Sequence, residues 1–534
     1  MAALISGLLL VLIVGCGQFP TDTGLRASNA LCSGVNPVKP LPGLPTLLNN
    51  IFYPMAGIQD PSEDCDFTYR RTITLDTATD QDDKQVKIII DSSNFDYANA
   101  LSDGADLRFL DQSYNIFDHW IEVWDTTGTS IVWVRVPTSG TDEFFMHYGN
   151  TSATDASDAG ATFSYTSARA IYWELQNSGT HTKSMASYSQ ANTVTVQTSG
   201  GPSTVVIGKN SVGAVASAIQ GAISVTGAIS GRALDSGGGR DTISALTLRG
   251  QIFGYPISRG TDRWEILNPG TADANISITN YNGSGGLLGT TNTVITAGQL
   301  LEVAADVTFG ILESDQNILA GYSVNNATDG MTLVPASTQL VGVNSNTGSL
   351  GVTQDGTTGT IYYSTGAIVP FSGDRGDSIT VNVGTATQGQ AAAVNIIANQ
   401  PIVAVAQADS DGSDTCSFWP PSEFSRDYVL PADSQYIAAA TLYDSTITVY
   451  NADTTVYGSC TATSDGLTPH KCWFGRTGSG IEFNAGTRIS SDKPFYIYYE
   501  YSDQDETNIL GPKQGRLLSD IEPVATVGPE YEVY

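Results

Sequence analysis

The stretch WIEVWDTTGTSIVWVRVP, from Trp120 to Pro137, is the clearest indication of the fold class in this sequence. Apolar and polar residues alternate on both sides of its polar, Gly-containing centre, which predicts two strands, Trp120–Trp124 and Ile131–Val136, joined by a turn. Similar short alternating segments recur nearby, and each is bounded by Gly, Asp, Asn or Ser: Tyr69–Leu75, Val86–Ile90 and Phe144–Tyr148. No long amphipathic helix is evident in the sequence after residue 65. The pattern predicts an all-β protein of several β-sandwich modules in tandem, of the jelly-roll or Ig-like kind.

The same stretch contains a candidate ligand-binding surface. Strict alternation would place Trp120, Glu122 and Trp124 on one face of their strand, and Trp133 with Arg135 on one face of the next. Exposed aromatic rings on a sheet can stack against sugar rings, so Trp120, Trp124 and Trp133 are candidate carbohydrate contacts. The alternative is that these three side chains fill the core of a sandwich.

Composition excludes several classes of function. The chain has 534 residues, with 54 Asp and Glu against 24 Lys and Arg, which gives a net charge of −30. Such a polyanion repels phosphate backbones, so we expect no nucleic-acid partner. Four histidines and six cysteines leave little material for zinc, haem or iron–sulfur sites. The common hydrolase and phosphate-binding motifs are absent from the sequence, and we therefore expect no enzymatic activity and no catalytic residues.

The N-terminus indicates export. Residues 4–14, LISGLLLVLIV, form an apolar run too short to span a bilayer and typical of a signal peptide. This run leads into Ile13-Val14-Gly15-Cys16, which looks like a lipobox, so residues 1–16 would be a signal peptide and Cys16 the lipidated anchor. No Lys or Arg precedes the run, which departs from the pattern, and plain secretion is the alternative. Residues 17–65 are rich in proline and predict an extended tether.

The remaining cysteines suit an oxidising, extracytoplasmic compartment. Cys460 and Cys472 flank a short polar connection and predict a disulfide across a hairpin. Cys32 and Cys65 could tie the tether to the first strand. Cys416 is then odd, and the sequence does not fix the connectivity.

A family resemblance covers about residues 66–163. The segments FTYRRTITL, GADLRFLD (Gly104–Asp111), Trp120–Pro137 and FFMHYGN (Phe144–Asn150) together resemble the domain of unknown function 2341 of prokaryotic surface and secreted proteins. The resemblance implies a β-sandwich on an extracytoplasmic protein and implies no known activity. Trp419-Pro420-Pro421 with Tyr428–Pro431 also resembles the IgG-Fc-binding-like region of some surface adhesins.

Behind this region the sequence repeats itself. The segment Ile276–Asn282 resembles Ile447–Asn451, and Val294–Gly298 resembles Ile481–Gly486. A short element, Ser314–Ile318, returns as Ser491–Phe495 and as Ala398–Ile402, each time before an apolar strand. We therefore expect β modules of common ancestry, with the chain divided into 66–165, 166–261, 262–365 and 366–534.

Two acidic loops are candidate calcium sites because alternating carboxylates bring hard oxygen ligands together. They contain Asp409, Asp411 and Asp414, and Asp503 and Asp505; solvated acidic loops are the alternative. Calcium is the one cofactor that the sequence indicates. Arg375-Gly376-Asp377 is a tripeptide that integrins bind on loop tips, and chance occurrence is its alternative.

These features together predict a non-enzymatic cell-surface or secreted protein for adhesion or carbohydrate contact. Its partners would be the membrane, through the N-terminal lipid, and a polysaccharide or another surface protein. One alternative is a structural subunit that pairs with itself in an extracellular filament or surface layer. The other is a carbohydrate-active enzyme, for which the sequence nominates no acid.

Overall fold

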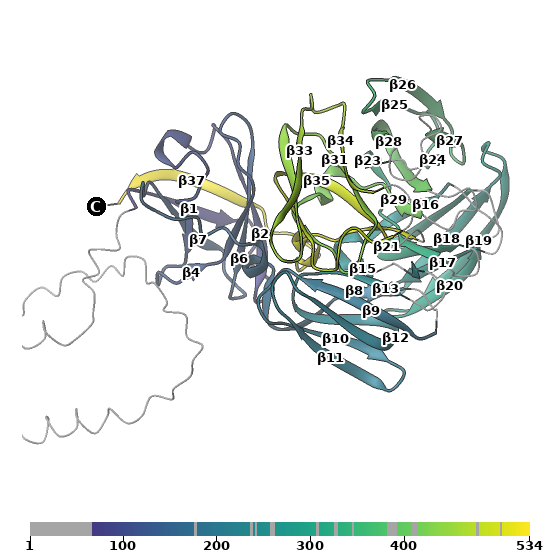
Figure 1. The fold of residues 1–534 in the computed structure, drawn as a ribbon, viewed down its shortest axis with the longest axis horizontal. Coiled ribbons are helices and arrows are strands. Elements are labelled where there is room, and N and C mark those ends of the chain that lie inside the picture. The colour runs from purple at the N-terminus through teal and green to yellow at the C-terminus, as the bar shows by residue number, and fades with distance from the viewer. Residues whose placement is uncertain are drawn as a thin grey trace, which may run out of the picture.

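A computed structural model describes residues 67–533 except 176–178, 235–238, 241–242, 257–261, 306–308, 325–328, 344–346, 382–391, 408–414, 477–479 and 502–504. The predicted all-β class is confirmed (Figure 1). All five strands expected between residues 69 and 148 are present, with ends within two residues of the prediction. Cys16, Cys32 and Cys65 lie outside the described residues, as do Asp409, Asp411, Asp414 and Asp503.

The N-terminal part is a sandwich of two sheets, here called the first sandwich. One sheet has the strand order β37-β1-β7-β3-β4 and the other β2-β6-β5. Apolar residues of the inner faces, including Val132, Val134 and Phe144, form one core between the sheets. The strands are β1 (Tyr69–Leu75), β2 (Lys84–Ile90), β3 (Arg108–Leu110), β4 (Ile116–Phe117), β5 (His119–Val123), β6 (Ser130–Val136), β7 (Glu143–Tyr148) and β37 (Ala525–Glu532), with a short 3-10 helix η2 (Tyr97–Asn99).

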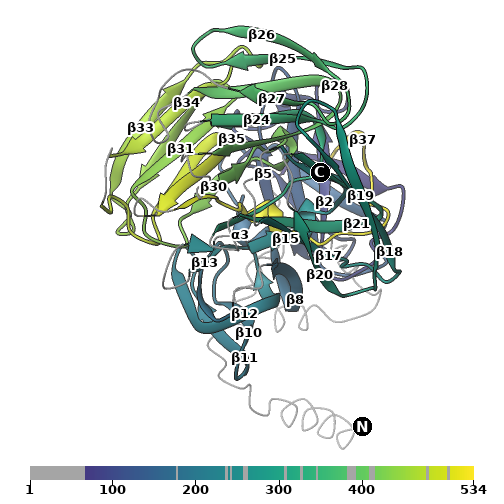
Figure 2. The ribbon, with the colours of Figure 1, turned by 90° about the vertical axis from the view of Figure 1, so that its right-hand side faces the viewer.

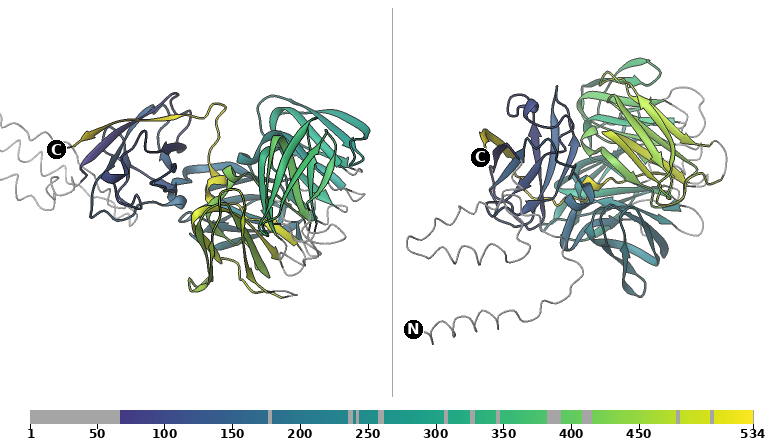
Figure 3. Two further views of the ribbon diagram at one scale, coloured as in Figure 1. Left: turned by 90° about the horizontal axis from the view of Figure 1, so that it is seen from above. Right: turned by 60° about the vertical axis from the view of Figure 1, so that its left-hand side comes forward.

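The first sandwich takes its last strand from the far end of the chain. β37 pairs antiparallel with β1, so that Tyr69 lies opposite Glu532. The Val533 amide donates to the Thr68 carbonyl at 2.8 Å, so both ends of the described chain meet at one edge. Figure 1 and Figure 3 show β37, in yellow, lying along the purple sandwich. Everything between β7 and β37 is therefore an insertion into this sandwich.

The insertion begins with a module built around one long strand, β12. β8, β9 and β10 each pair with β12, and β11 pairs with β10. A one-turn helix, α3 (Ala159–Thr162), connects it to the first sandwich. The strands are β8 (Ser164–Glu174), β9 (His181–Ser187), β10 (Asn192–Thr198), β11 (Gly201–Ile207), β12 (Val212–Gly227), β13 (Ile229–Leu234), β14 (Gly239–Arg240) and β15 (Ile243–Ala245), followed by the 3-10 helix η3 (Leu246–Leu248).

Three further modules share one strand order. In the second module the order is β19-β18-β21-β17-β20, and β16 and β22 also pair with β21; the third and fourth modules repeat it strand for strand. The second module contains β16 (Gly250–Tyr255), β17 (Asp262–Leu267), β18 (Ala274–Tyr281), β19 (Leu287–Ile295), β20 (Leu300–Ala305), β21 (Phe309–Val324) and β22 (Asp329–Thr332). The third contains β23 (Ser337–Val343), β24 (Thr347–Val352), β25 (Thr357–Tyr363), β26 (Ile368–Gly373), β27 (Ser378–Val381), β28 (Ala393–Gln407) and β29 (Thr415–Ser417). The fourth contains β30 (Ser425–Val429), β31 (Tyr436–Thr441), β32 (Ser445–Tyr450), β33 (Val456–Ala462), β34 (His470–Gly475), β35 (Arg488–Tyr501) and β36 (Asp505–Asn508).

The division at residues 166, 262 and 366 stays a prediction. Residue 262 is the first residue of β17, and residue 366 lies in the turn between β25 and β26. The repeated strand order groups the chain as β16–β22, β23–β29 and β30–β36.

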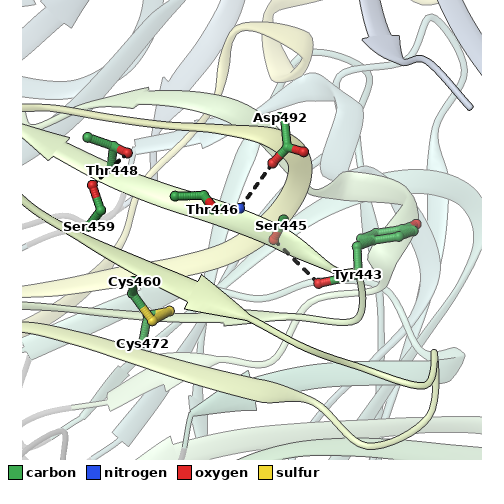
Figure 4. The surroundings of a disulfide bond; sticks show 8 residues. All are labelled: Tyr443, Ser445, Thr446, Thr448, Ser459, Cys460, Cys472 and Asp492. Carbon is green, nitrogen blue, oxygen red and sulfur yellow. Dashed lines mark hydrogen bonds between the residues drawn. A yellow bond between two sulfur atoms is a disulfide. The ribbon is translucent and has the colours of Figure 1, made fainter.

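The short repeated element marks an irregularity in each long strand. In β21, β28 and β35 the pairing with the first strand of the module breaks at Ser314–Asn317, Ala398–Pro401 and Ser491–Pro494. The long strand then leaves one sheet and enters the facing sheet. The side chain of the second residue of the element accepts a hydrogen bond from a backbone amide in each module. Asp315 accepts from Asn275 at 2.8 Å, and Asn399 accepts from Thr358 at 2.8 Å. Asp492 accepts from Thr446 at 3.1 Å (Figure 4). One side-chain oxygen thus fixes the same bend in all three modules, which explains why this element recurs in the sequence.

The four modules are arranged around a common centre (Figure 2). β22 lies against β14 on one side and against β29 on the other, and β29 lies against β36. One apolar core joins residues of all four modules, among them Ile171, Leu267, Leu340 and Tyr498. We call this arrangement the ring.

The tripeptide Arg375-Gly376-Asp377 lies between two modules of the ring. The Arg375 guanidinium donates to both carboxylate oxygens of Glu313, at 2.9 and 2.8 Å, and to the Tyr281 hydroxyl at 2.7 Å. Gly376 has a φ of +94°, and a Cβ there would meet the Tyr281 ring at 2.2 Å. The tripeptide therefore holds the second and third modules together.

Candidate binding cleft

A cleft of about 490 Å³ lies where the first sandwich meets the first and fourth modules of the ring. We call it the junction cleft. No single module could form it, because its walls come from three parts of the chain that are distant in sequence. Its lining residues from the first sandwich and α3 are Ser102, Asp103, Trp120, Ile121, Trp124, Asp155, Ser157, Asp158, Ala159 and Gly160; those from the ring are Tyr188, Lys209, Asn210, Arg426, Asp427, Val429, Arg488, Asp492 and Lys493.

The floor of the junction cleft depends on a β-bulge. The pairing of β5 with β6 shifts between Ile121 and Val123, so Glu122 is an extra residue in its strand. Because of this bulge, Trp124 does not share a face with Trp120 and Glu122 as strict alternation predicts. It packs instead against the inner core, edge-on to Phe95 and Tyr97 at 6.0 and 5.2 Å between ring centroids.

Trp120 and Trp133 lie on the outer face of the same sheet and are buried, with 3% and 8% of their surface exposed. Both pack edge-on or tilted against Phe163, in a cluster that includes Tyr188 of the ring. Their burial fits the alternative in which these residues fill a core, here the core between the first sandwich and the ring. Of the three tryptophans, Trp124 is the partly exposed one.

The fourth module closes one wall of the cleft through its repeated element. Lys493 of that element donates to the Trp124 carbonyl at 2.8 Å. Arg426 of β30 donates to the Ile121 carbonyl at 2.7 Å and to the Ser491 carbonyl at 3.1 Å. Two cationic side chains thus bind the backbone of β5 and of the residue that follows it, which fixes the width of the cleft.

The opposite wall carries carboxylates in two different states. Asp158 at the start of α3 forms an ion pair with Lys209 at 2.8 Å and accepts the Ala161 amide. Asp103 and Asp155 are exposed. Within the described part of the chain, each carboxylate accepts one hydrogen bond, from the backbone amide two residues further along the sequence. Their free carboxylate oxygens are available to a ligand in the cleft.

Two more polar groups line the fourth-module side. Asp427 accepts the Ser490 hydroxyl at 2.6 Å. The Arg488 guanidinium lies over the Tyr450 ring at 4.3 Å and is partly exposed. A guanidinium in contact with an aromatic ring is restrained in position and still carries N–H donors that can bind hydroxyl or carboxylate oxygens.

A buried ionic cluster behind the cleft attaches the ring to the first sandwich. Glu122 accepts the Trp133 indole N–H at 2.7 Å and pairs with Lys513 of the 3-10 helix η5 (Pro512–Gly515). Glu423 of the 3-10 helix η4 (Pro421–Glu423) pairs with Arg516 at 3.3 Å. Burial would raise the pKa of Glu423, but Arg516 and Lys513 lower it overall.

The histidines of the first sandwich are packed within it. Burial, with a smaller contribution in the same direction from the charge of Arg108, lowers the pKa of His119 to about 3. Burial likewise lowers the pKa of His147 to about 4. Both imidazoles are therefore neutral at physiological pH, and neither lines the junction cleft.

The predicted Cys460–Cys472 disulfide is present and joins β33 to β34 (Figure 4). Cys416 is buried, and its sulfur lies 3.6 Å from the Tyr496 hydroxyl. Asp505 begins β36, but its side chain lies outside the described part of the chain, so calcium at either acidic loop stays a prediction. Within the described residues, no helix is both long and apolar enough to cross a membrane.

Sequence reasoning missed most of the cleft. Asp103, Asp155, Lys209, Arg426 and Arg488 are ordinary polar residues in turns and strands, and their spacing along the chain carries no signal. The repeated element Ser491–Phe495 was visible as a repeat, but its contact with Trp124 depends on how the fourth module docks.

Comparison with known proteins supports the family resemblance. Residues 103–175 match the family model of DUF2341, a domain of unknown function. The match confirms the resemblance seen in the sequence, and it includes Asp103, Trp120, Trp124 and Asp155 of the junction cleft. No curated protein matches the chain. The DUF2341 match and the all-β fold are compatible with a surface protein; the resemblance of Trp419–Pro431 to adhesin regions stays a prediction.

Proposed function

We propose that this chain is a non-enzymatic extracytoplasmic protein that binds carbohydrate on another surface through the junction cleft. In this proposal Cys16 carries a lipid anchor, and residues 17–65 hold the folded part away from the membrane.

The observation that carries the proposal is the composition of the cleft. It combines the partly exposed residue Trp124 with free carboxylate oxygens on Asp103 and Asp155 and the guanidinium of Arg488, which lies over the Tyr450 ring. Sugars are bound by this combination, because their C–H faces pack on aromatic rings while their hydroxyls need both donors and acceptors. The volume of about 490 Å³ lies within the range of roughly 300–1,000 Å³ that small-molecule pockets occupy.

The state of the other charged groups favours binding over catalysis. Asp158 is paired with Lys209, Asp427 holds Ser490, and Asp492 fixes the bend of β35. General acid–base catalysis most often uses a histidine, and no histidine is among the described residues that line the cleft. The three carboxylates named here already have partners within the protein.

A glycan array probed with the purified full chain tests this proposal. We expect binding to a subset of glycans, lost or weakened at least tenfold in Arg488→Ala and Asp155→Asn. Matched controls are Arg263→Ala on β17 and Asp453→Asn in an exposed turn, which should bind as wild type does. Binding that none of the cleft substitutions changes, or the absence of any glycan bound above background, would contradict the proposal.

A further inference from the structure

The disulfide of the fourth module has a histidine beside it. Cys460 of β33 is bonded to Cys472 of β34 (Figure 4), and His470 precedes Cys472 by two residues. Residues two apart in a strand lie on the same face, so His470 and Cys472 project from one face of β34. The two sulfurs and one ring nitrogen of His470 all lie within 4.8 Å of one another. In the part of the chain that the structure describes, no other group of three or more His, Cys, Asp or Glu side chains brings its ligand atoms this close.

This cluster lies where the strand order of the fourth module begins and ends. β33 pairs with β32, and β34 pairs with β31, so the disulfide links the two end strands of the order β33-β32-β35-β31-β34. Cys472 is buried in the core of the module, whereas Cys460 and His470 are partly exposed. A reductant and a metal ion can therefore reach the cluster from the solvent.

Two thiolates and an imidazole are a donor set that zinc binds. Zn²⁺ prefers a tetrahedral arrangement, and a site with three protein ligands takes water as its fourth. Bonds of about 2.3 Å to sulfur and about 2.0 Å to nitrogen place the ligand atoms roughly 3.5–3.8 Å apart. The Cα atoms of Cys460 and Cys472 are 6.0 Å apart, so two sulfurs that are no longer bonded can reach this separation by side-chain rotation.

We propose that Cys460, His470 and Cys472 form a redox-controlled zinc site. The oxidised chain holds the disulfide, and the reduced chain binds one Zn²⁺, which replaces the disulfide as the link between β33 and β34. Two molecules of a small thiol, RSH, supply two electrons and two protons, so that the protein gains two Cys thiols and RSSR is formed. Zn²⁺ then displaces the two thiol protons, which pass to water, and binds both sulfurs and the unprotonated ring nitrogen of His470.

Zinc binding to the reduced full chain tests the proposal. The chain is reduced under nitrogen with a phosphine, which gives the same dithiol as a thiol does and competes only weakly for zinc. Zn²⁺ is then titrated against a chromophoric chelator. Reduced wild type should bind one Zn²⁺ more per chain than Cys460→Ser/Cys472→Ser, which keeps every other cysteine. Oxidised wild type should lack this ion.

Single substitutions identify the ligands. His470→Ala should weaken the binding of this zinc ion by roughly tenfold or more, because one of three protein ligands is lost. Cys416→Ala is the matched control, since it removes a cysteine outside the cluster, and it should bind zinc as wild type does. Co²⁺ in place of Zn²⁺ should give stronger cobalt–thiolate absorption in reduced wild type than in Cys460→Ser/Cys472→Ser.

The melting temperature gives a second readout. Zn²⁺ should restore most of the fall in melting temperature that reduction causes in wild type, and it should leave that of Cys460→Ser/Cys472→Ser unchanged. Three results would each overturn the proposal: reduced wild type that binds no more zinc than the double variant, His470→Ala that binds it as tightly as wild type, or zinc that does not change the melting of reduced wild type. The carbohydrate proposal is independent of these outcomes, because none of the three residues lines the junction cleft.

Discussion

The ion pair between Lys513 and Glu122 should be essential for attaching the ring to the first sandwich. Lys513 and Glu122 are 3% and 2% exposed, and Glu122 has one further donor, the Trp133 indole N–H at 2.7 Å. Lys513→Met keeps the length of the side chain but removes its charge, so a carboxylate is left buried beside Trp133. Breaking a buried pair in this way costs about 3–5 kcal/mol. Lys209→Met, which breaks a half-exposed pair with Asp158, should cost only about 0–1 kcal/mol.

Urea unfolding followed by tryptophan fluorescence measures this cost, because Trp120 and Trp133 lie at the interface that opens. We expect the transition of Lys513→Met to move to clearly lower urea. The double variant Lys513→Met/Glu122→Gln should recover most of the loss, since a neutral amide needs no counter-charge and can still accept the indole N–H. A loss below about 1 kcal/mol in the single variant, or a double variant no more stable than the single one, would show that this ion pair does not hold the ring to the first sandwich.

Three further predictions concern stability. Arg375→Ala removes the bonds to Glu313 and Tyr281 between two modules and should cost about 1–3 kcal/mol in urea unfolding, with Arg375→Lys restoring only part of it. Reduction of the Cys460–Cys472 disulfide, or its replacement by two serines, should lower the stability of the fourth module by about 3 kcal/mol, measured by differential scanning calorimetry. The lowered pKa of His119, about 3 in the folded chain, means that the unfolded chain takes up the proton first. The free energy of unfolding is therefore highest above pH 6.5 and falls as the pH is lowered toward 3, by about 3 kcal/mol at pH 4.5. His119→Gln removes this titration, so the melting temperature of the variant should fall less between pH 7 and 4.5.

Local patterns predicted the strands but not their assembly. Alternation identified β1, β2, β5, β6 and β7 because apolar and polar residues alternate along each of them and the side-chain period of a strand is two. The same rule was wrong for Trp124, because the extra residue at Glu122 in the bulge reverses the faces after it. A bulge is set by the partner strand, so one strand's sequence does not reveal it.

Long-range features had no local signal. Nothing in Ala525–Glu532 distinguishes a strand of the fourth module from one that returns to pair with β1. The junction cleft is a consequence of that return, because the segment from η5 to β37 holds the first sandwich against the ring. The repeats at Ser314, Ala398 and Ser491 were visible in the sequence because each module needs Asp or Asn at the next position, where the side-chain oxygen accepts a backbone amide at the bend.

Hydrogen–deuterium exchange with and without a bound oligosaccharide tests the location of the binding site most directly. We expect protection to be confined to the segments that line the junction cleft, residues 102–103, 120–124, 155–160, 188, 209–210, 426–429 and 488–493. Protection elsewhere on the molecule, with these segments unchanged, would contradict the proposed binding site.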